Sequence, residues 1–154
     1  MREILFRGKR KDNGEWVEGY YICLNGNHHR IYTGYAETDC GEYFADWLEV
    51  APETVGRYTG LTDKNGKRIF EGDIVKDAGS YISVIKIGCC LPSEFYEIFD
   101  FEIFNKNNLK ICAVYAEHVF GEYKGEHFLL PEKNSTIVIG NIHDNPELLE
   151  VQEQ

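Results

Sequence analysis

The hydrophobic and polar residues of this chain alternate over short stretches, which is the pattern of β-strands. Runs rich in Ile, Val, Tyr and Phe are separated by glycines, prolines and Asn-Gly pairs, and Asn-Gly favours tight turns because both residues accept a positive φ at low cost. The pattern therefore predicts a mainly β chain, with strands over residues 4–11, 15–24, 30–35, 47–50, 54–61, 67–70, 74–75, 80–87, 110–116, 128–130 and 136–142.

The first two strands are predicted to form an N-terminal hairpin. The turn between them is Asp12-Asn13-Gly14. Alternation along the second strand divides its side chains between two faces, one carrying Trp16, Tyr20 and Ile22 and the other carrying Val17, Tyr21 and Cys23. Further along, the polar residues 37–42 indicate a loop.

A second predicted hairpin turns at residues 63–66, where Gly66 is placed for a left-handed backbone. Gly72 and Asp73 then break the strand pattern, and the Asp73 carboxylate is expected to accept backbone N–H groups in that turn. A phosphate-binding loop is an alternative interpretation of the glycines in this region. Such a loop precedes a helix N-terminus, whereas these glycines separate strands, so turn chemistry explains them better.

In the last patterned segment, residues 138–149, a predicted strand is followed by a predicted helix. Asn145 is predicted to cap a short C-terminal helix with its side-chain oxygen, and Pro146 suits the first helical position. His143 next to Asp144 offers an alternative, a general base with its orienting carboxylate, but adjacent residues seldom face each other in that way. Residues 93–104 fit either a strand or a helix, and the sequence leaves both open.

Length and composition agree with a small folded protein. The chain has 154 residues, of which 43% are hydrophobic, so a buried core is expected. The pattern fits one continuous domain or two regions, an N-terminal β region over residues 1–50 and a second β region over residues 51–150. Charges in the first seven residues argue against a signal peptide, and no apolar run is long enough to span a bilayer, so we expect a cytoplasmic protein without a membrane partner.

The charge of the chain constrains its partners. Its net charge is −10, and residues 86–154 contain twelve acids and five bases, a net charge of −7. Phosphate backbones repel such a chain, so non-specific nucleic-acid binding is not expected. Ten Tyr, nine Phe and two Trp are therefore assigned to core and interface packing rather than to base stacking.

Cysteine and histidine spacing predicts no metal and no cofactor. The five cysteines are odd in number and irregularly spaced, which indicates reduced thiols rather than a disulfide framework. Metal sites usually contain a closely spaced ligand pair, and none occurs here. The remaining candidates are interpreted as polar loop histidines with an unrelated thiol: His28, His29, Cys40, His118 and His127.

Two long segments resemble the signatures of the YopX family. They are residues 58–75 and residues 138–149, in that order, and residues 2–8 also resemble the start of that family. Residues 7–10 read Arg-Gly-Lys-Arg where the family often has Arg-Ala-Trp-Asp, and residues 77–135 contain no matching motif. The motif positions, to which we assign a structural or binding role, are Tyr58, Thr59, Gly60, Asp63, Gly66, Glu71, Gly72, Asp73, Gly140, Asn141, Asn145 and Pro146.

The resemblance implies a phage or prophage protein that acts in the cytoplasm of a bacterial host. It also implies a small SH3-like β-barrel in the C-terminal part of the chain, behind the N-terminal hairpin region and followed by the short helix. It brings no established activity, no catalytic residues and no cofactor to this sequence.

Three functions from different classes remain. The first is a non-enzymatic protein-binding or assembly module, which includes self-association through exposed strand edges. The second is an acidic mimic of nucleic acid that acts on a host DNA-binding enzyme, suggested by the charge of residues 86–154. The third is a small hydrolase or transferase that uses Asp73, Glu71 or His143. The absence of a catalytic signature favours the first.

Overall fold

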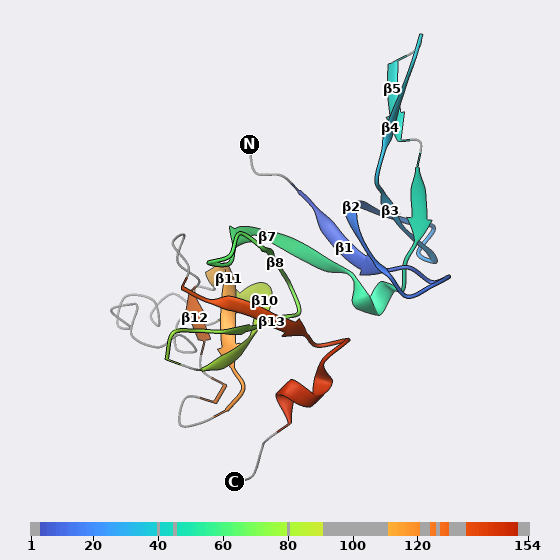
Figure 1. The fold of residues 1–154 in the computed structure, drawn as a ribbon. Helices are drawn as coiled ribbons and strands as arrows, with labels where there is room; N and C mark the ends of the chain where they lie inside the picture. The colour runs from blue at the N-terminus through green and yellow to red at the C-terminus, as the bar shows by residue number, and fades with distance from the viewer. Residues whose placement is uncertain are drawn as a thin grey trace. The chain divides into compact units, whose positions relative to one another are not determined.

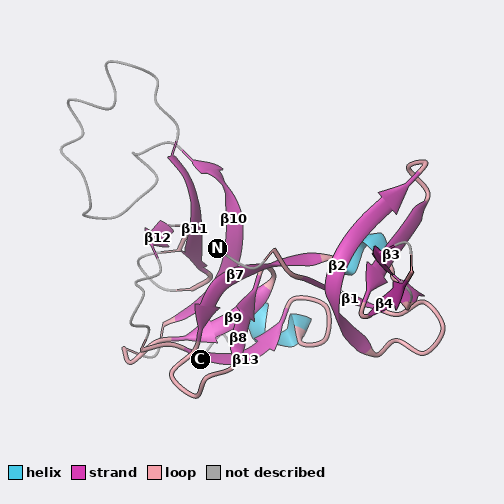
Figure 2. Ribbon diagram, turned by 90° about the horizontal axis from the view of Figure 1, so that it is seen from above, coloured by secondary structure: helices cyan, strands magenta, loops and turns pink. Residues whose placement is uncertain are grey.

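The computed structural model describes residues 4–39, 41–44, 46–79, 81–90, 111–120, 124–125, 127–129 and 135–150 (Figures 1 and 2). Strands make up most of this part, and its longest helix is a single 3₁₀ turn of four residues. No helix in the described ranges is long and apolar enough to cross a bilayer. The chain is thus mainly β, as predicted. In order, the elements are β1 (Phe6–Lys9), β2 (Trp16–Leu24), β3 (His28–Tyr32), β4 (Tyr35–Thr38), β5 (Gly41–Phe44), β6 (Trp47–Glu49), η1 (Pro52–Thr54), β7 (Gly56–Thr62), β8 (Arg68–Phe70), β9 (Asp73–Lys76), β10 (Ile82–Cys90), β11 (Ile111–His118), β12 (His127–Leu129), β13 (Ile137–Asn141) and η3 (Pro146–Leu149).

The chain forms two compact units, residues 1–58 and residues 59–154. The first unit is built on an antiparallel sheet in the order β6-β3-β2-β1, and the first residues of β7 add to β1. The predicted N-terminal hairpin is confirmed, because β1 pairs with β2 from Phe6 opposite Gly19 to Lys9 opposite Trp16. Gly14 in its turn has a φ of 74°, as the Asn-Gly pair predicts.

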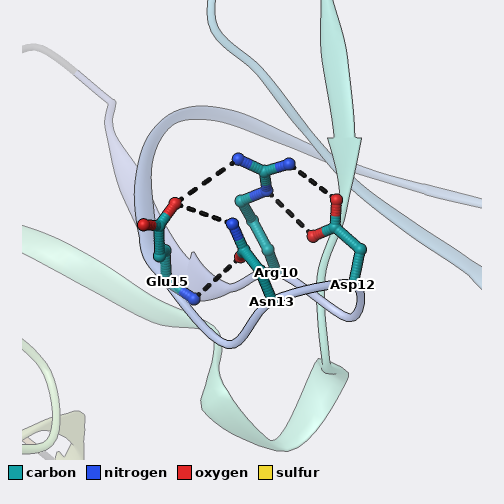
Figure 3. Close-up of polar contacts among 4 residues, drawn as sticks. All are labelled: Arg10, Asp12, Asn13 and Glu15. Carbon is teal, nitrogen blue, oxygen red and sulfur yellow. Dashed lines mark hydrogen bonds and ion pairs between the residues drawn. The ribbon is translucent and has the colours of Figure 1, made fainter.

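A polar network holds the turn between β1 and β2 (Figure 3). The guanidinium of Arg10 donates from Nε and Nη2 to the two carboxylate oxygens of Asp12, at 3.0 and 2.6 Å, and Nη1 lies 3.6 Å from Glu15 Oε2. Asn13 joins the other side, since its amide donates to Glu15 Oε2 at 2.7 Å and its Oδ1 accepts the Glu15 N–H at 3.0 Å. The Arg10 hydrogen bond is the main reason that the pKa of Asp12 is lowered. All these groups are exposed or half-exposed, so the network orders the turn more than it stabilises the unit.

The core of the first unit is small and depends on two glycines. Ile31 and Val50 are fully buried. A Cβ at Gly8 would lie 3.1 Å from the Val50 Cβ, and a Cβ at Gly19 would lie 2.2 Å from the Tyr32 carbonyl oxygen and 2.8 Å from the Ile31 Cγ2. The sheet therefore curves closely around Ile31 only because these strand positions carry no side chain.

This curvature brings the end of β1 back to β6. Arg10 forms an isolated antiparallel bridge with Val50. On either side of the bridge, Lys11 N–H donates to the Glu49 carbonyl at 3.0 Å and Ala51 N–H donates to the Lys9 carbonyl at 2.8 Å. Two hydrogen bonds thus join the C-terminal end of β1 to the C-terminal end of β6. The described strands do not form a closed barrel, and the SH3-like barrel in the C-terminal part stays a prediction.

The loop predicted over residues 37–42 is wrong. Strands β4 and β5 pair with each other in a separate two-stranded sheet, from Tyr35 opposite Phe44 to Thr38 opposite Gly41. Two paired strands satisfy each other's backbone hydrogen bonds without packing an apolar face against a core. The polar sequence of this segment therefore gave no sign of a strand.

The second unit contains a five-stranded antiparallel sheet in the order β12-β11-β10-β9-β13. Its core cluster consists of Ile69, Val75, Ile85, Ala116 and Val138. Because Ile69 lies on β8 and the other four on the sheet, the β7–β8 hairpin packs on one face of the sheet. Gly66 in the turn of this hairpin has a φ of 82°, as predicted. Residues 93–104, which fitted a strand or a helix, lie outside the described residues.

The C-terminal segment departs from its prediction. Pro146–Leu149 forms one 3₁₀ turn, and the predicted short α-helix is not confirmed. Pro146 occupies its first turn as expected, but Asn145 makes no side-chain cap hydrogen bond, and that prediction is wrong. The Asn145 side-chain oxygen instead accepts the Asn141 N–H at 3.4 Å, because the chain folds back on the end of β13. The Asn145 backbone carbonyl accepts the Leu148 N–H at 3.1 Å.

Candidate functional site

Asp63 of the first motif is an internal hydrogen-bond acceptor. Its side chain is buried, with 5% exposed. Oδ1 accepts the N–H groups of Asn65 and Lys67 at 2.8 and 2.9 Å, and Oδ2 accepts the N–H of Val138 on β13 at 3.1 Å. One carboxylate therefore closes the β7–β8 turn and fastens the last strand to it.

The ionisation of Asp63 is coupled to the stability of the second unit. Burial raises the pKa of this carboxyl, but the hydrogen bonds from Lys67, Val138 and Asn65 together outweigh burial and lower it. A carboxyl with a lowered pKa in the folded state contributes stability above its unfolded pKa, and this contribution is lost as pH falls through the folded value. We expect the second unit to lose stability below about pH 4, the pKa of an unfolded Asp.

Urea denaturation at a series of pH values measures this effect. The Asp63→Asn variant, which has no carboxyl at this position, is expected to show a flatter acid dependence than the wild type. Asp77→Asn is the matched control, because Asp77 is a turn carboxylate in the same unit with one exposed hydrogen bond, from Tyr81 N–H. Equal acid dependence of the wild type and Asp63→Asn would contradict the assignment.

The other motif residues of this region also satisfy the backbone. Thr59 Oγ1 donates to the Ile69 carbonyl at 2.8 Å and accepts the Leu61 N–H at 3.1 Å. Gly60 and Gly72 have φ values of 83° and 81°. The N–H of Tyr58, which is half-buried, donates to the Leu5 carbonyl at 2.8 Å.

Gly72 and Asp73 hold three strands at one turn. Gly72 N–H donates to the Ile85 carbonyl and Gly72 C=O accepts the Ile142 N–H, both at 2.9 Å. Asp73 Oδ2 accepts the Phe70 N–H at 2.8 Å, as turn chemistry predicted. Asp73 is only 1% exposed, so a substrate has no access to its carboxylate.

The second motif forms the turn after β13. Asn141 Oδ1 accepts the N–H groups of His143 and Asp144, both at 3.0 Å, and its amide donates to Asp144 Oδ2 at 2.8 Å. Gly140 leaves room for Asn145, since a Cβ there would lie 2.5 Å from the Asn145 Oδ1. Asn141 thus holds the backbone of both residues of the His143–Asp144 pair and also the carboxylate of Asp144.

The candidate catalytic residues belong to separate turns. Asp73 is enclosed under the β8–β9 turn, half-buried Glu71 precedes it in that turn, and half-buried His143 lies in the turn after β13. No group of three His, Cys, Asp or Glu side chains suited to a metal ion occurs among the residues that the structure describes. Eight of the twelve acidic residues between 86 and 154 lie outside the residues that the structure describes. The spacing of the four described acids gives no support to the nucleic-acid mimic.

The interpretation of the four candidate histidines as loop residues is wrong, because each lies in a strand, and His127 begins β12. His28 and His29 begin β3, and His118 ends β11. His29 Nδ1 lies 2.5 Å from the Tyr21 hydroxyl oxygen. His118 is buried opposite Ser83, and its Nδ1 lies 2.7 Å from the Ser83 Oγ. Spacing along the sequence could not show this pair, because the strand register creates it.

A row of aromatic side chains crosses the sheet of the first unit. Residues directly opposite each other in antiparallel strands share a face. Tyr20 of β2 lies opposite Tyr32 of β3, and Tyr32 lies opposite Trp47 of β6. Trp16 belongs to the same face, because it lies four residues before Tyr20 on β2 and side chains alternate between the two faces of a strand. We call this surface the aromatic face; its aromatic residues are Trp16, Tyr20, Tyr32 and Trp47.

Cations lie against both tryptophans of the aromatic face. The Arg30 guanidinium carbon is 3.7 Å from the centre of the Trp47 ring. Arg7 and Lys9 of β1 lie over the Trp16 ring, at 4.7 and 5.6 Å from its centre. These distances fall within the range of cation–π attraction. The stacked cations fix the orientation of the indole rings.

The aromatic face is accessible at its β6 end. Trp47 is 44% exposed, whereas the other three aromatics are half-buried. The charged groups of Glu49 and Arg30 beside Trp47 already have partners. Glu49 Oε1 lies 3.4 Å from His28 Nδ1 and 4.0 Å from Arg30 Nη2. The surface thus offers large, oriented aromatic and guanidinium groups with little unbalanced charge, which suits contact with another protein.

The sequence predicted only part of this surface. The alternation of β2 placed Trp16, Tyr20 and Ile22 on one face, and the register confirms it. It did not connect Arg30, Tyr32 or Trp47 with that face. The signal was present in the alternation of residues 28–32 and 47–49, but alternation does not specify which strands become neighbours.

The model of the YopX protein family matches residues 5–150. The chain belongs to the YopX family. A search of curated proteins found no match. Among solved structures, the chain is similar to the crystal structure of protein EF1440 from Enterococcus faecalis, with 24% sequence identity and a TM-score of 0.49, over 97% of this chain and 100% of that one. Several of the YopX motif residues make hydrogen bonds that join the turns and strands of the second unit: Thr59, Asp63, Gly72, Asp73, Asn141 and Asn145.

Proposed function

We propose that this YopX-family chain is a non-enzymatic protein-binding module and that the aromatic face of its first unit contacts the partner. The single observation that carries the proposal is the row of Tyr20, Tyr32 and Trp47 across three strands, with Arg30 stacked on Trp47 at 3.7 Å. Trp, Tyr and Arg are the residues most enriched among the energetic centres of protein interfaces. Rings that are already oriented lose little conformational freedom on binding.

The family resemblance supplies the setting of this proposal. We place the module in the cytoplasm of a bacterial host, as a phage or prophage protein that acts in assembly or on a host protein. The SH3-like barrel of residues 51–150 belongs to the same proposal. In this division of roles, the second unit carries the family's hydrogen-bonded turns and the first unit carries the contact surface.

Affinity capture from bacterial cells that express the tagged full chain tests the proposal. Single variants Trp47→Ala and Arg30→Ala are compared with the wild type and with Ile139→Ala. Ile139 is a matched control because it is an exposed strand residue of the second unit, with 38% of its surface accessible. A partner of the aromatic face should bind the wild type and Ile139→Ala equally and each aromatic-face variant at least about tenfold more weakly, since a central interface residue contributes about 2 kcal/mol or more.

The captured protein is then purified and titrated into the wild type and each variant by calorimetry. Circular dichroism of each variant controls for folding. The proposal fails if the folded aromatic-face variants bind the purified partner as tightly as the wild type does.

A further inference from the structure

The outer edge of β6 presents backbone groups that the sheet does not use. Val50 N–H donates to the His29 carbonyl and Thr33 N–H donates to the Asp46 carbonyl. Because hydrogen-bonded positions alternate along an antiparallel strand, residues 46, 48 and 50 direct their backbone groups toward β3, and residues 47 and 49 direct theirs away from it. No described strand lies on that outer side, since β6 is the last strand of the sheet.

The chain itself begins to use this edge and then leaves it. Lys11 N–H donates to the Glu49 carbonyl, on the outer side of β6, and Arg10 forms the bridge with Val50. Two residues further on, a continuing strand would meet Trp47. Instead the chain turns, because Gly14 N–H donates to the Arg10 carbonyl. The Trp47 N–H and C=O are therefore left without a partner among the described residues.

A groove lies at the point where the chain turns away. Its volume is about 360 Å³, and it is lined by Lys11, Asp12, Trp47, Leu48 and Glu49. We call it the edge groove. The backbone edge forms one side of it, and apolar atoms of Trp47 and Leu48 accompany that edge. An extended chain could enter and continue the ladder that Arg10 and Lys11 begin.

The charges of the edge groove are complementary to an acidic segment. Asp12 is paired with Arg10 at 2.6 Å, and Glu49 lies near His28 and Arg30. The Lys11 ammonium is exposed and makes no ion pair with a described residue. The two carboxylates of the groove are thus already balanced, and its remaining charge is positive.

We propose that the edge groove binds an extended peptide segment of a partner protein by strand addition beside Trp47, with an acidic side chain of that segment paired with Lys11. This inference rests on the proposed function and names the class of partner segment. Trp47 N–H and C=O hydrogen-bond the backbone of the segment, and Lys11 selects a carboxylate. Alternate side chains of the segment contact Trp47 and Leu48.

Nuclear magnetic resonance titration of the ¹⁵N-labelled full chain tests the inference. The probe is the pentapeptide Ac-Thr-Val-Asp-Val-Thr-NH₂, and its two matched analogues replace Asp by Lys or methylate the Asp backbone nitrogen. We expect saturable shifts of the amides of Lys11, Trp47 and Leu48 with the Asp peptide, and binding at least about tenfold weaker with either analogue. The charge-reversed variant Lys11→Glu should prefer the Lys peptide over the Asp peptide.

Four outcomes would overturn the inference. They are no saturable shift with the Asp peptide, shifts confined to residues outside the groove, equal binding of the N-methylated analogue, and a wild-type dimer that Lys11→Glu dissociates while the peptides do not bind. The last would make the occupant a second copy of this chain. If the peptide does not bind but the aromatic-face variants still weaken capture of a partner, only the inference about the edge groove is wrong. If the peptide binds but the aromatic-face variants bind the captured partner as tightly as the wild type, only the proposed aromatic interface is wrong.

Discussion

Replacing Asp63 by alanine is expected to destabilise the second unit by about 2–6 kcal/mol, because three backbone N–H groups lose their acceptor. Leaving the buried one unsatisfied costs about 1–3 kcal/mol, and losing the hydrogen bond of each of the two part-buried ones costs about 0.5–1.5 kcal/mol. Those donors are Asn65, Lys67 and Val138. A loss of this size is comparable with the whole stability of a small domain. Calorimetry measures the loss, and hydrogen exchange of the Val138 amide shows directly whether β13 has separated from the β7–β8 turn.

The control for this substitution is Asp77→Ala. Asp77 also accepts a backbone N–H, that of Tyr81 at 2.9 Å, but the bond is exposed and water can replace it. We expect this control to cost less than about 1 kcal/mol, within the usual range for an exposed polar substitution. If Asp63→Ala is as stable as Asp77→Ala, the carboxylate does not hold the two segments together.

Replacing Gly19 by alanine is expected to destabilise the first unit by about 3 kcal/mol, at the upper end of the cost of inserting an atom into a packed core. The added Cβ would lie 2.2 Å from the Tyr32 carbonyl oxygen, which is backbone and cannot rotate away. The β2–β3 pair must therefore separate, and Ile31 must move with it. Denaturant unfolding followed by the fluorescence of Trp16 and Trp47 measures this change, since both tryptophans lie in the first unit.

Gly88→Ala is the matched control for Gly19→Ala. Gly88 is also in a strand interior, on β10, but the nearest atom to its added Cβ is 3.8 Å away, in ordinary contact. Alanine there is expected to be neutral or slightly stabilising. Equal stability of the two alanine variants would show that the β2–β3 approach is looser than the structure indicates.

Local patterns predicted the parts of the fold that depend on neighbouring residues. The first hairpin, its Gly14 turn and the left-handed Gly66 follow from alternation and turn chemistry alone. Asp73 accepts a backbone N–H as its position in the turn predicts. The capping prediction for Asn145 failed for the opposite reason, because the end of β13 lies close enough to take the side-chain oxygen.

Strand neighbours and closures could not be predicted in this way. A strand pattern specifies two faces but not the partner on either edge. The approach of Arg10 to Val50, the row from Tyr20 to Trp47 and the contact of Ser83 with His118 all come from pairings between distant segments. The ribbon of β4 and β5 was missed because the polar sequence of residues 37–42 is typical of a loop.

The candidate sites divide in the same manner. The YopX motif residues could be found in the sequence, and their turn-forming role could be expected from residue type. Which N–H groups they accept could not, since the Val138 amide is 75 positions from Asp63. The aromatic face and the edge groove carry no motif and become visible only once β6 is placed at the sheet edge.

The hydrogen bond between Asp63 and Val138 also bears on how the chain is made. During synthesis the β7–β8 hairpin leaves the ribosome long before β13 does. Until β13 is synthesised, the Asp63 carboxylate lacks the Val138 N–H and the outer edge of β9 lacks its neighbouring strand. Contacts of such long sequence separation slow folding and leave unpaired strand edges exposed in the meantime. The pairs β1–β2, β2–β3 and β3–β6 all lie within residues 6–49, so they can form while the second unit is still being translated. Nascent chains stalled before residue 137 should therefore expose a protease-sensitive second unit behind an already resistant first one.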